Sequence, residues 1–222
     1  HGWDDLIFTH LSARIPGPDH HFLINPFGLL FEEVTASNLV KIDLEGNILL
    51  DTGYSINNAG FVIHGAVHEA RDDAMAVLHT HTEAGMAVAA QKWGLLPLSQ
   101  TAMSITHSLS YHDYEGIALD MDERVRLVAD LGDTDFMILR NHGLLTVGRT
   151  IGEAFSRMFF FEKACTAQIG ALSAGYDNLN MPSAQSEATV AKQTTRHDRP
   201  TGGPEWAAML RKLDRIDSGY RQ

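Results

Sequence analysis

The chain has 222 residues, of which 44% are hydrophobic, and a mean hydropathy of −0.12, as expected for one globular domain. Its formal net charge is −11 and no stripe of basic residues is present, so neither nucleic acid nor an anionic membrane is expected as a partner. No apolar run approaches the ~18 residues of a membrane helix, and no signal peptide is expected before the first motif. The single cysteine, Cys165, allows no intrachain disulfide and favours a cytoplasmic location.

The first third of the chain has the alternation and the turn signals of an antiparallel sheet. Four short strands are expected, at residues 5–14, 21–25, 39–43 and 47–50. The segment Pro26-Phe27-Gly28 is expected to form a turn after the second of them.

Helical and strand patterns then alternate along the chain. The expected helices span residues 60–71, 83–92, 122–131 and 150–173. Suitable N-cap residues precede or open them: Asn57 or Asn58, Thr82, Asp122 and Thr150. Short apolar runs at residues 74–78, 136–140 and 144–147 predict buried strands, whereas residues 97–118 are expected to be irregular.

The C-terminal part changes composition. Residues 175–204 are polar and poor in aromatic side chains, which predicts a linker or a surface arm. Residues 205–216 have apolar side chains at helical spacing, which predicts a terminal helix. We therefore expect a main domain at residues 1–174, a linker or arm at 175–204 and a helical tail at 205–222. The whole pattern favours an α+β fold with helices packed on a mainly antiparallel sheet.

Three histidines carry the clearest chemical signal. His79 and His81 follow a buried-strand pattern, and side chains two residues apart in a strand point the same way. His142 follows a second such pattern, within Arg140-Asn141-His142-Gly143. Three imidazoles on strand ends can bind one divalent metal and leave a coordination position open, which is typical of a catalytic site. The H-x-H spacing alone is weak evidence, because it also occurs by chance.

Several ordered segments resemble the class II aldolase/adducin family, and its adducin-like branch in particular. They are NNAGFVIHGAVHEARDD, GLLP, YHDYEG and ILRNHGLL, and the resemblance extends over residues 3–173. It implies a three-layer α/β/α sandwich around a nine-stranded, mainly antiparallel sheet, and a homo-oligomer, commonly a tetramer. It also implies that zinc is held by His79, His81 and His142 and polarises the carbonyl group of a small-molecule substrate.

The chain departs from the family pattern at two places. The sugar-phosphate aldolases carry a carboxylate nineteen residues before the first metal-binding histidine, and Gly60 stands there in this chain. Their phosphate site uses a Thr-Gly turn and two serines, where this chain has Phe27-Gly28, Asn58 and Ala59. We therefore expect a non-phosphorylated substrate and a general base other than the usual carboxylate.

Three residues are candidates for the missing acid–base function. Tyr114 and His112 lie in the His- and Tyr-rich segment that family members use near their sites, although both could be structural. Glu83 follows His81 closely, but a carboxylate at a helix N-terminus is favourable without any catalytic role. His64 and His68 are spaced like metal ligands on a helix, yet we interpret them as packing residues.

Five further residues are candidates for contacting the substrate. They come from segments that resemble anion-binding or phosphate-binding segments of the family: Ser12, Arg14, Asn25, Gly28 and Asn58. Arg14 suits bidentate recognition of a carboxylate, although a surface ion pair would explain it equally well.

Three functions remain open from the sequence. The first is a metal-dependent lyase that performs retro-aldol cleavage or decarboxylation, with Zn²⁺ as the expected metal and Fe²⁺ or Mn²⁺ as alternatives. The second is a non-haem iron oxygenase or decarboxylase acting on aromatic acids, as the resemblance to some aldolase-fold enzymes allows. The third is a non-enzymatic interaction module of the cytoskeletal, actin-binding adducin type.

Overall fold

The computed structural model describes residues 1–118, 120–195 and 203–222, and these contain one eight-stranded sheet. The strand order is β4-β3-β2-β1-β5-β8-β7-β6. The strands are β1 (His10–Arg14), β2 (Phe22–Ile24), β3 (Val40–Ile42), β4 (Ile48–Leu50), β5 (Ala76–Thr80), β6 (Leu109–His112), β7 (Phe136–Leu139) and β8 (Gly143–Gly148). Every neighbouring pair is antiparallel except β6 with β7, so the predicted α+β class with a mainly antiparallel sheet is confirmed. The resemblance implies nine strands, and the described residues contain one fewer.

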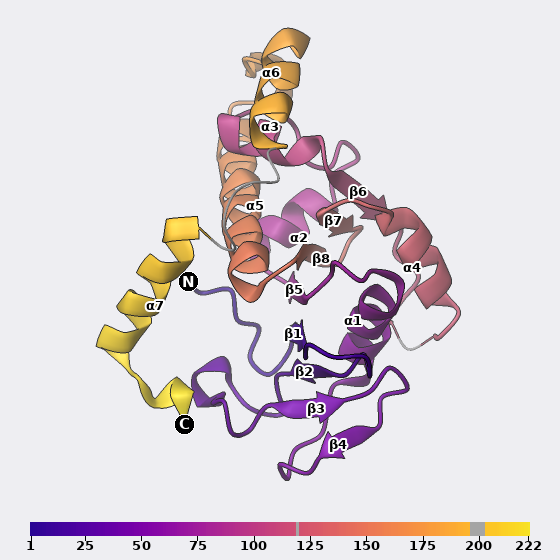
Figure 1. Cartoon of the computed structure of the whole chain (residues 1–222). Coiled ribbons are helices and arrows are strands. Elements are labelled where there is room, and N and C mark those ends of the chain that lie inside the picture. The colour runs from indigo at the N-terminus through magenta and orange to yellow at the C-terminus, as the bar shows by residue number, and fades with distance from the viewer. Residues whose placement is uncertain (119, 196–202) are drawn as a thin grey trace.

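Helices lie on both sides of the sheet (Figure 1). They are α1 (Asn58–Ala70), α2 (Glu83–Ala89), α3 (Gln100–Thr106), α4 (Glu123–Leu131), α5 (Ile151–Leu172), α6 (Ala184–Thr194) and α7 (Gly203–Ile216), with 3-10 turns at Phe31–Glu33, Tyr176–Asn178 and Gly219–Arg221. One buried apolar cluster joins β5, β7 and β8 to α2, α3 and α5. A second joins the opposite faces of the same strands to α1 and α4.

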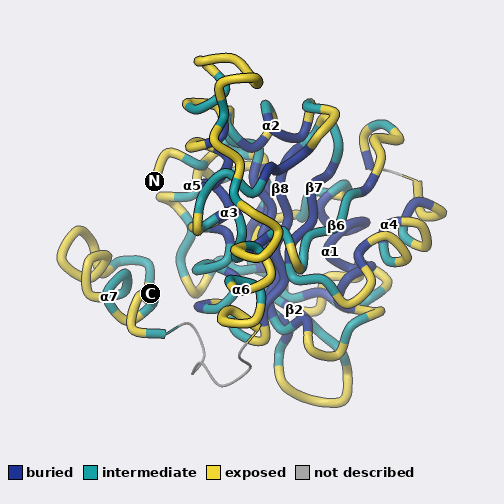
Figure 2. Tube along the Cα trace, turned by 90° about the horizontal axis from the view of Figure 1, so that it is seen from above, coloured by how far each residue is buried: buried dark blue, intermediate teal, exposed yellow. Residues whose placement is uncertain are grey.

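The central strand β5 is buried along its whole length because it has neighbours on both edges and helices on both faces. Figure 2 shows the buried central strands and the more exposed outer helices α6 and α7. A strand in this position needs a continuous apolar run, which is what the sequence shows before His79. The fold therefore fixes the position of the end of β5, and with it the positions of His79 and His81, which follow the apolar run.

Side-chain caps begin the helices near the predicted places. Asn57 caps α1 by accepting a hydrogen bond from the Ala59 amide, and Thr82 caps α2 by accepting one from the Gly85 amide. Thr150 caps α5 in the same way. Asp122 precedes α4 as expected, but its side chain forms no capping hydrogen bond.

The expectation that residues 97–118 are irregular was wrong, and the segment expected to be a linker or surface arm, residues 175–204, contains a helix. Residues 97–118 contain helix α3 and strand β6, and β6 is held in place by parallel pairing with β7. Residues 175–204 contain helix α6, which Ser183 caps and which contacts the end of α3 through a hydrogen bond between His107 and Thr194. The last part of that predicted linker, residues 196–202, lies outside the described residues.

The C-terminal segment forms the predicted helix and packs back on the main domain. Trp206 of α7 contacts Phe155 of α5, with ring centroids 5.4 Å apart. The carbonyl oxygen of Tyr220 accepts a hydrogen bond from the Ala36 amide over 2.9 Å. None of the described helices has the length and apolarity that crossing a membrane requires.

Candidate metal centre

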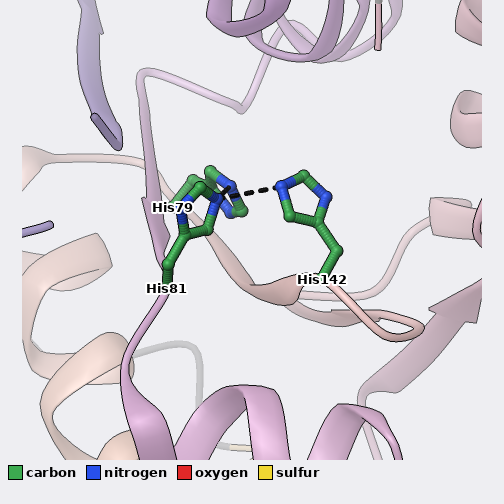
Figure 3. Close-up of side chains that lie close together, drawn as sticks. All are labelled: His79, His81 and His142. Atoms are coloured by element: carbon green, nitrogen blue, oxygen red, sulfur yellow. Dashed lines mark hydrogen bonds between the residues drawn. The ribbon is translucent and has the colours of Figure 1, made fainter. Parts of the chain in front are cut away.

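The end of β5 and the turn between β7 and β8 bring three histidines together (Figure 3). Nε2 of His81 lies 2.7 Å from Nε2 of His79 and 2.9 Å from Nε2 of His142. One ligand atom from each of the three residues lies within 4.8 Å of the others. The structure therefore assembles the three residues that the sequence proposes as metal ligands.

The Asn-His-Gly turn has the backbone that this assembly needs. Asn141 has a φ of 57°, a left-handed conformation that Asn tolerates better than most residues. Gly143 has no room for a side chain, because a Cβ there would clash with the carbonyl oxygen of Thr80. These two residues allow the turn to approach β5 closely enough for His142 to meet His79 and His81.

Hydrogen bonds at the other ring nitrogens determine which atoms face the centre. Nδ1 of His79 lies 2.9 Å from the carbonyl oxygen of Leu144, and Nδ1 of His81 lies 3.0 Å from Oδ2 of Asp5. Both partners are acceptors, so in each ring Nδ1 carries the proton. The Nε2 atoms of His79 and His81 therefore face each other over 2.7 Å, an arrangement in which both rings can bind one shared cation.

Burial keeps the His79 and His142 rings in the uncharged form that metal binding requires. Burial, followed by the neighbouring imidazoles of His142 and His81, lowers the pKa of His79 well below 6.5. Burial, together with His81, lowers the pKa of His142 to about 4. At neutral pH His79 and His142 therefore offer unprotonated imidazole nitrogens, which are the donors that Zn²⁺ and other borderline divalent ions prefer.

A buried carboxylate supports the segment that carries two of the histidines. Oε1 of Glu162 on α5 accepts a hydrogen bond from the Thr80 hydroxyl over 2.5 Å, and Oε2 accepts one from the Thr82 hydroxyl over 2.6 Å. Burial raises the pKa of Glu162 above its usual value, and the two hydroxyls oppose that rise. Because Thr80 and Thr82 flank His81, the carboxylate fixes the backbone on both sides of this histidine.

The three acid–base candidates lie in different surroundings. Tyr114 is 54% exposed, and its ring centroid lies 6.3 Å from that of His142. His112 is buried, with Nδ1 2.7 Å from Asp130 and Nε2 3.5 Å from Glu123. Tyr114, His112 and His142 line one small pocket. Glu83 is the exposed first residue of α2, where its charge favours the helix N-terminus.

The five substrate-binding candidates divide into two groups. Ser12, Arg14 and Asn25 are buried and engaged by protein groups. Gly28 and Asn58 are exposed, Gly28 in a turn with a φ of 95° and Asn58 at the start of α1. Only the second group is open to a dissolved molecule in this structure.

The buried candidates form contacts within the protein. Oγ of Ser12 lies 2.7 Å from Nδ1 of His64 and 2.8 Å from Nε2 of His68, so these two histidines are buried packing partners of β1. Arg14 forms an ion pair with the exposed Asp72 over 3.4 Å. The side chain of Asn25 accepts a hydrogen bond from the Leu11 amide over 2.8 Å.

Two residues of the centre were missed by the sequence analysis. Asp5 and Glu162 contact the histidine segment from distant parts of the chain, and neither lies in a motif that marks it. The only signal for Glu162 is a charged residue among the apolar positions of a long helix, in the stretch FFFEKAC. Such a residue is rarely buried without a partner, so it could have been marked for a structural role.

Comparisons with known proteins agree with this fold. The family model "Class II Aldolase and Adducin N-terminal domain" matches residues 1–169. A crystal structure of an aldolase II superfamily protein from Pseudomonas syringae is 54% identical, with a TM-score of 0.96 over 99% of this chain and 88% of that one. L-fuculose 1-phosphate aldolase from Glaciozyma antarctica PI12 is 28% identical, with a TM-score of 0.86 over 100% of this chain and 86% of that one.

The similarity also extends to the adducins. Alpha-adducin of Mus musculus is 41% identical over 234 residues, which cover 99% of this chain and 31% of the adducin. The family match over most of the chain and the identity to alpha-adducin lead to the same assignment. The chain is a member of the class II aldolase/adducin family.

Proposed function

We propose that this chain is a divalent-metal-dependent lyase that acts on a non-phosphorylated carbonyl compound by retro-aldol cleavage or decarboxylation. The observation that supports this most is the pair of imidazole Nε2 atoms of His79 and His81, which lie 2.7 Å apart, with Nε2 of His142 2.9 Å from that of His81. Imidazole nitrogens that converge in this way can share one divalent cation. The similarity to a fuculose phosphate aldolase supports the choice of a lyase.

His79, His81 and His142 would hold the metal, and Asp5 and the Leu144 carbonyl orient two of the rings. We expect Zn²⁺, with Fe²⁺ or Mn²⁺ as alternatives, because imidazole suits all three to different degrees. When bound, such an ion supplies Lewis-acid polarisation of a substrate carbonyl.

Proton transfer would then fall to side chains around the cluster. Tyr114 is the first candidate, because it is exposed and lies close to the His142 ring. His112 lines the same small pocket, but its contacts with Asp130 and Glu123 favour a role in positioning the Tyr114 segment. Glu83 remains a weaker candidate at the exposed start of α2.

The residues near the usual phosphate site favour an uncharged or carboxylate-bearing substrate. Phe27 and Ala59 provide no hydroxyl donors, while the exposed Gly28 and Asn58 leave a backbone and an amide group for polar contacts. Ser12, Arg14 and Asn25 are engaged inside the protein and would position neighbouring groups. We also propose that the protein is a homo-oligomer, a tetramer by analogy with family aldolases. We propose a cytoplasmic location because the single cysteine is a free, buried thiol.

Two other functions have specific support. An iron oxygenase or decarboxylase acting on aromatic acids would use the same three histidines, since a site without a carboxylate ligand could suit Fe²⁺. An adducin-like interaction module, of the actin-binding type, is supported by the 41% identity to alpha-adducin, of which this chain spans about a third.

One panel of assays separates these functions. Protein loaded with Zn²⁺, Mn²⁺ or anaerobic Fe²⁺ is mixed with hydroxy- and keto-acids, their phosphorylated counterparts and aromatic hydroxy-acids. We expect cleavage or CO₂ release from a non-phosphorylated compound, lost in His142→Ala. Oxygen consumption with Fe²⁺ would favour the oxygenase, and actin co-sedimentation by protein that binds no metal would favour the interaction module.

A further inference from the structure

The imidazole of His10 lies beside the three-histidine cluster. His10 on β1 pairs in register with His79 on β5, and the two rings are nearly parallel, at 13°, with centroids 6.2 Å apart. Its side chain is 6% exposed, and neither ring nitrogen has a hydrogen-bond partner among the described residues. Buried polar atoms without partners are rare, because leaving them unpaired destabilises the folded state. The ring therefore requires an explanation beyond packing.

His10 fills the space that a side chain at residue 60 would need. A Cβ atom at Gly60 would lie 2.6 Å from Cγ and Cδ2 of His10 and 2.8 Å from its Nδ1. These distances are too short for real Cβ contacts, so the His10 ring and a larger residue 60 exclude each other. By the family resemblance, residue 60 corresponds to the position of the carboxylate in the sugar-phosphate aldolases. In this chain an imidazole occupies the space next to that position.

The backbone before His10 is held in an unusual conformation. Thr9 is buried and has a φ of 70°, a conformation that is strained for a β-branched residue. The Asn25 side chain holds both neighbours of His10, since Oδ1 accepts from the Leu11 amide at 2.8 Å and Nδ2 donates to the Thr9 carbonyl at 3.5 Å. The surrounding protein thus places His10 without using its ring nitrogens, and local strain of this kind is frequent at functional sites.

A row of hydrogen bonds behind His10 leaves another nitrogen unpaired. Nδ1 of His68 donates to the Ala74 carbonyl over 2.8 Å, so the Nε2 of the neutral ring accepts from the Ser12 hydroxyl. Ser12 Oγ then accepts from Nδ1 of His64, and His64 keeps a bare, unpaired Nε2. The His64 ring lies edge-on to that of His10, with centroids 5.8 Å apart. A polar molecule bound near β1 would satisfy nitrogens that the protein leaves unpaired.

We propose that His10 contacts the ligand of the metal centre, by a hydrogen bond between its imidazole and an oxygen of a bound hydroxy- or keto-carbonyl compound. It takes the place of the carboxylate that is missing at Gly60. Asn25 and the strained Thr9 act as positioning residues for this contact. The inference rests on the proposed function, because it requires a metal-bound small molecule beside His79.

The test uses full-length protein loaded with Co²⁺, whose visible spectrum reports the metal ligands, and acetohydroxamate as a small oxygen chelator. Wild type is compared with His10→Phe, which keeps the ring volume, with His10→Gln, which keeps a hydrogen-bonding group, and with the exposed control His107→Gln. We expect all four proteins to bind Co²⁺ and His10→Phe to bind acetohydroxamate about tenfold more weakly, as loss of one hydrogen bond predicts. His10→Gln should recover most of that loss, and His107→Gln should match wild type.

Each other outcome decides against part of the account. Equal acetohydroxamate affinity in wild type, His10→Phe and His10→Gln would overturn the role of His10 and leave the proposed function intact. Loss of Co²⁺ from folded His10→Phe and His10→Gln would also overturn it, because His10 would then act on the metal rather than on the ligand. Failure of the wild-type protein to bind Co²⁺ would overturn the proposed function, and the inference with it.

Discussion

The carboxylate of Glu162 accepts a hydrogen bond over 2.5 Å from the hydroxyl of Thr80, the residue between His79 and His81. Its second oxygen accepts one from Thr82 over 2.6 Å, so a single buried side chain on α5 restrains both sides of the histidine segment. Helix α5 therefore supports the candidate metal centre from one face of the sheet, whereas α1, which carries His64 and His68, lies on the other face.

Removal of this carboxylate should destabilise the protein. Glu162→Ala leaves the Thr80 and Thr82 hydroxyls without their acceptor, and losing two hydrogen bonds to a buried carboxylate costs about 3 kcal/mol. Urea unfolding measures the change, with the exposed Glu32→Ala as a control that should stay within about 0.5 kcal/mol of wild type. A Glu162→Ala protein as stable as the control would show that the carboxylate does not support the segment.

The metal-free protein should lose stability as the pH falls from about 6.5 to 4. Burial lowers the pKa of His68 to about 4, so between these values the unfolded chain binds a proton that the folded protein does not. The contribution of His68 to the free energy of unfolding is therefore fully present above pH 6.5. It decreases as the pH falls toward 4, by up to about 3 kcal/mol. Urea titrations in EDTA at pH 7, 5.5 and 4.5 measure this, and a flat profile would contradict it.

The strain at Thr9 should be detectable by substitution with glycine. Thr9→Gly removes the Cβ that disfavours a φ of 70°, so the free energy of unfolding should stay unchanged or rise by about 1 kcal/mol. Ala13→Gly, in strand β1 shortly after Thr9 and outside the left-handed region, should lower it by about 1 kcal/mol. The two variants are compared by thermal and urea unfolding, and an equal loss in both would mean that Thr9 is not strained.

Metal binding should stabilise the folded protein through the three histidines. An ion at one hundred times its Kd adds about 2.7 kcal/mol, which raises Tm by several degrees. The rise should disappear in His79→Ala and remain in His107→Ala, whose side chain lies on the surface. Differential scanning calorimetry with and without a chelator gives the comparison. A rise of the same size in His79→Ala would place the ion elsewhere.

Patterns within one segment allowed the best predictions from sequence. The apolar run before His79 and the Asn141-His142-Gly143 turn predicted two strand ends, and the structure brings them together. Strand β6 was missed because four residues that pair only at the sheet edge carry no clear period, and their conformation depends on β7. Helix α6 was missed because it is polar and depends on contact with α3.

The contacts around the centre could not be predicted in this way. Asp5 lies 76 positions from His81 in the sequence, and Glu162 lies 82 positions from Thr80 and 80 from Thr82. No local sequence pattern indicates contacts between residues so far apart. His10 lies in an ordinary strand pattern, and only the fold places it against Gly60. The glycine at residue 60 did indicate a changed site, but not which residue fills it. The three-layer arrangement implied by the family resemblance and the domain boundaries stay predictions.

The most direct test of the account is the metal content of the purified protein, measured by elemental analysis beside His142→Ala. We predict about one equivalent of a divalent metal, zinc first, in the wild-type protein and its loss from the variant, because His142 supplies one of the three converging nitrogens. Iron in the same amount would keep the site and favour the oxygenase. No metal in either protein, even after loading, would contradict the metal centre and leave the adducin-like interaction module.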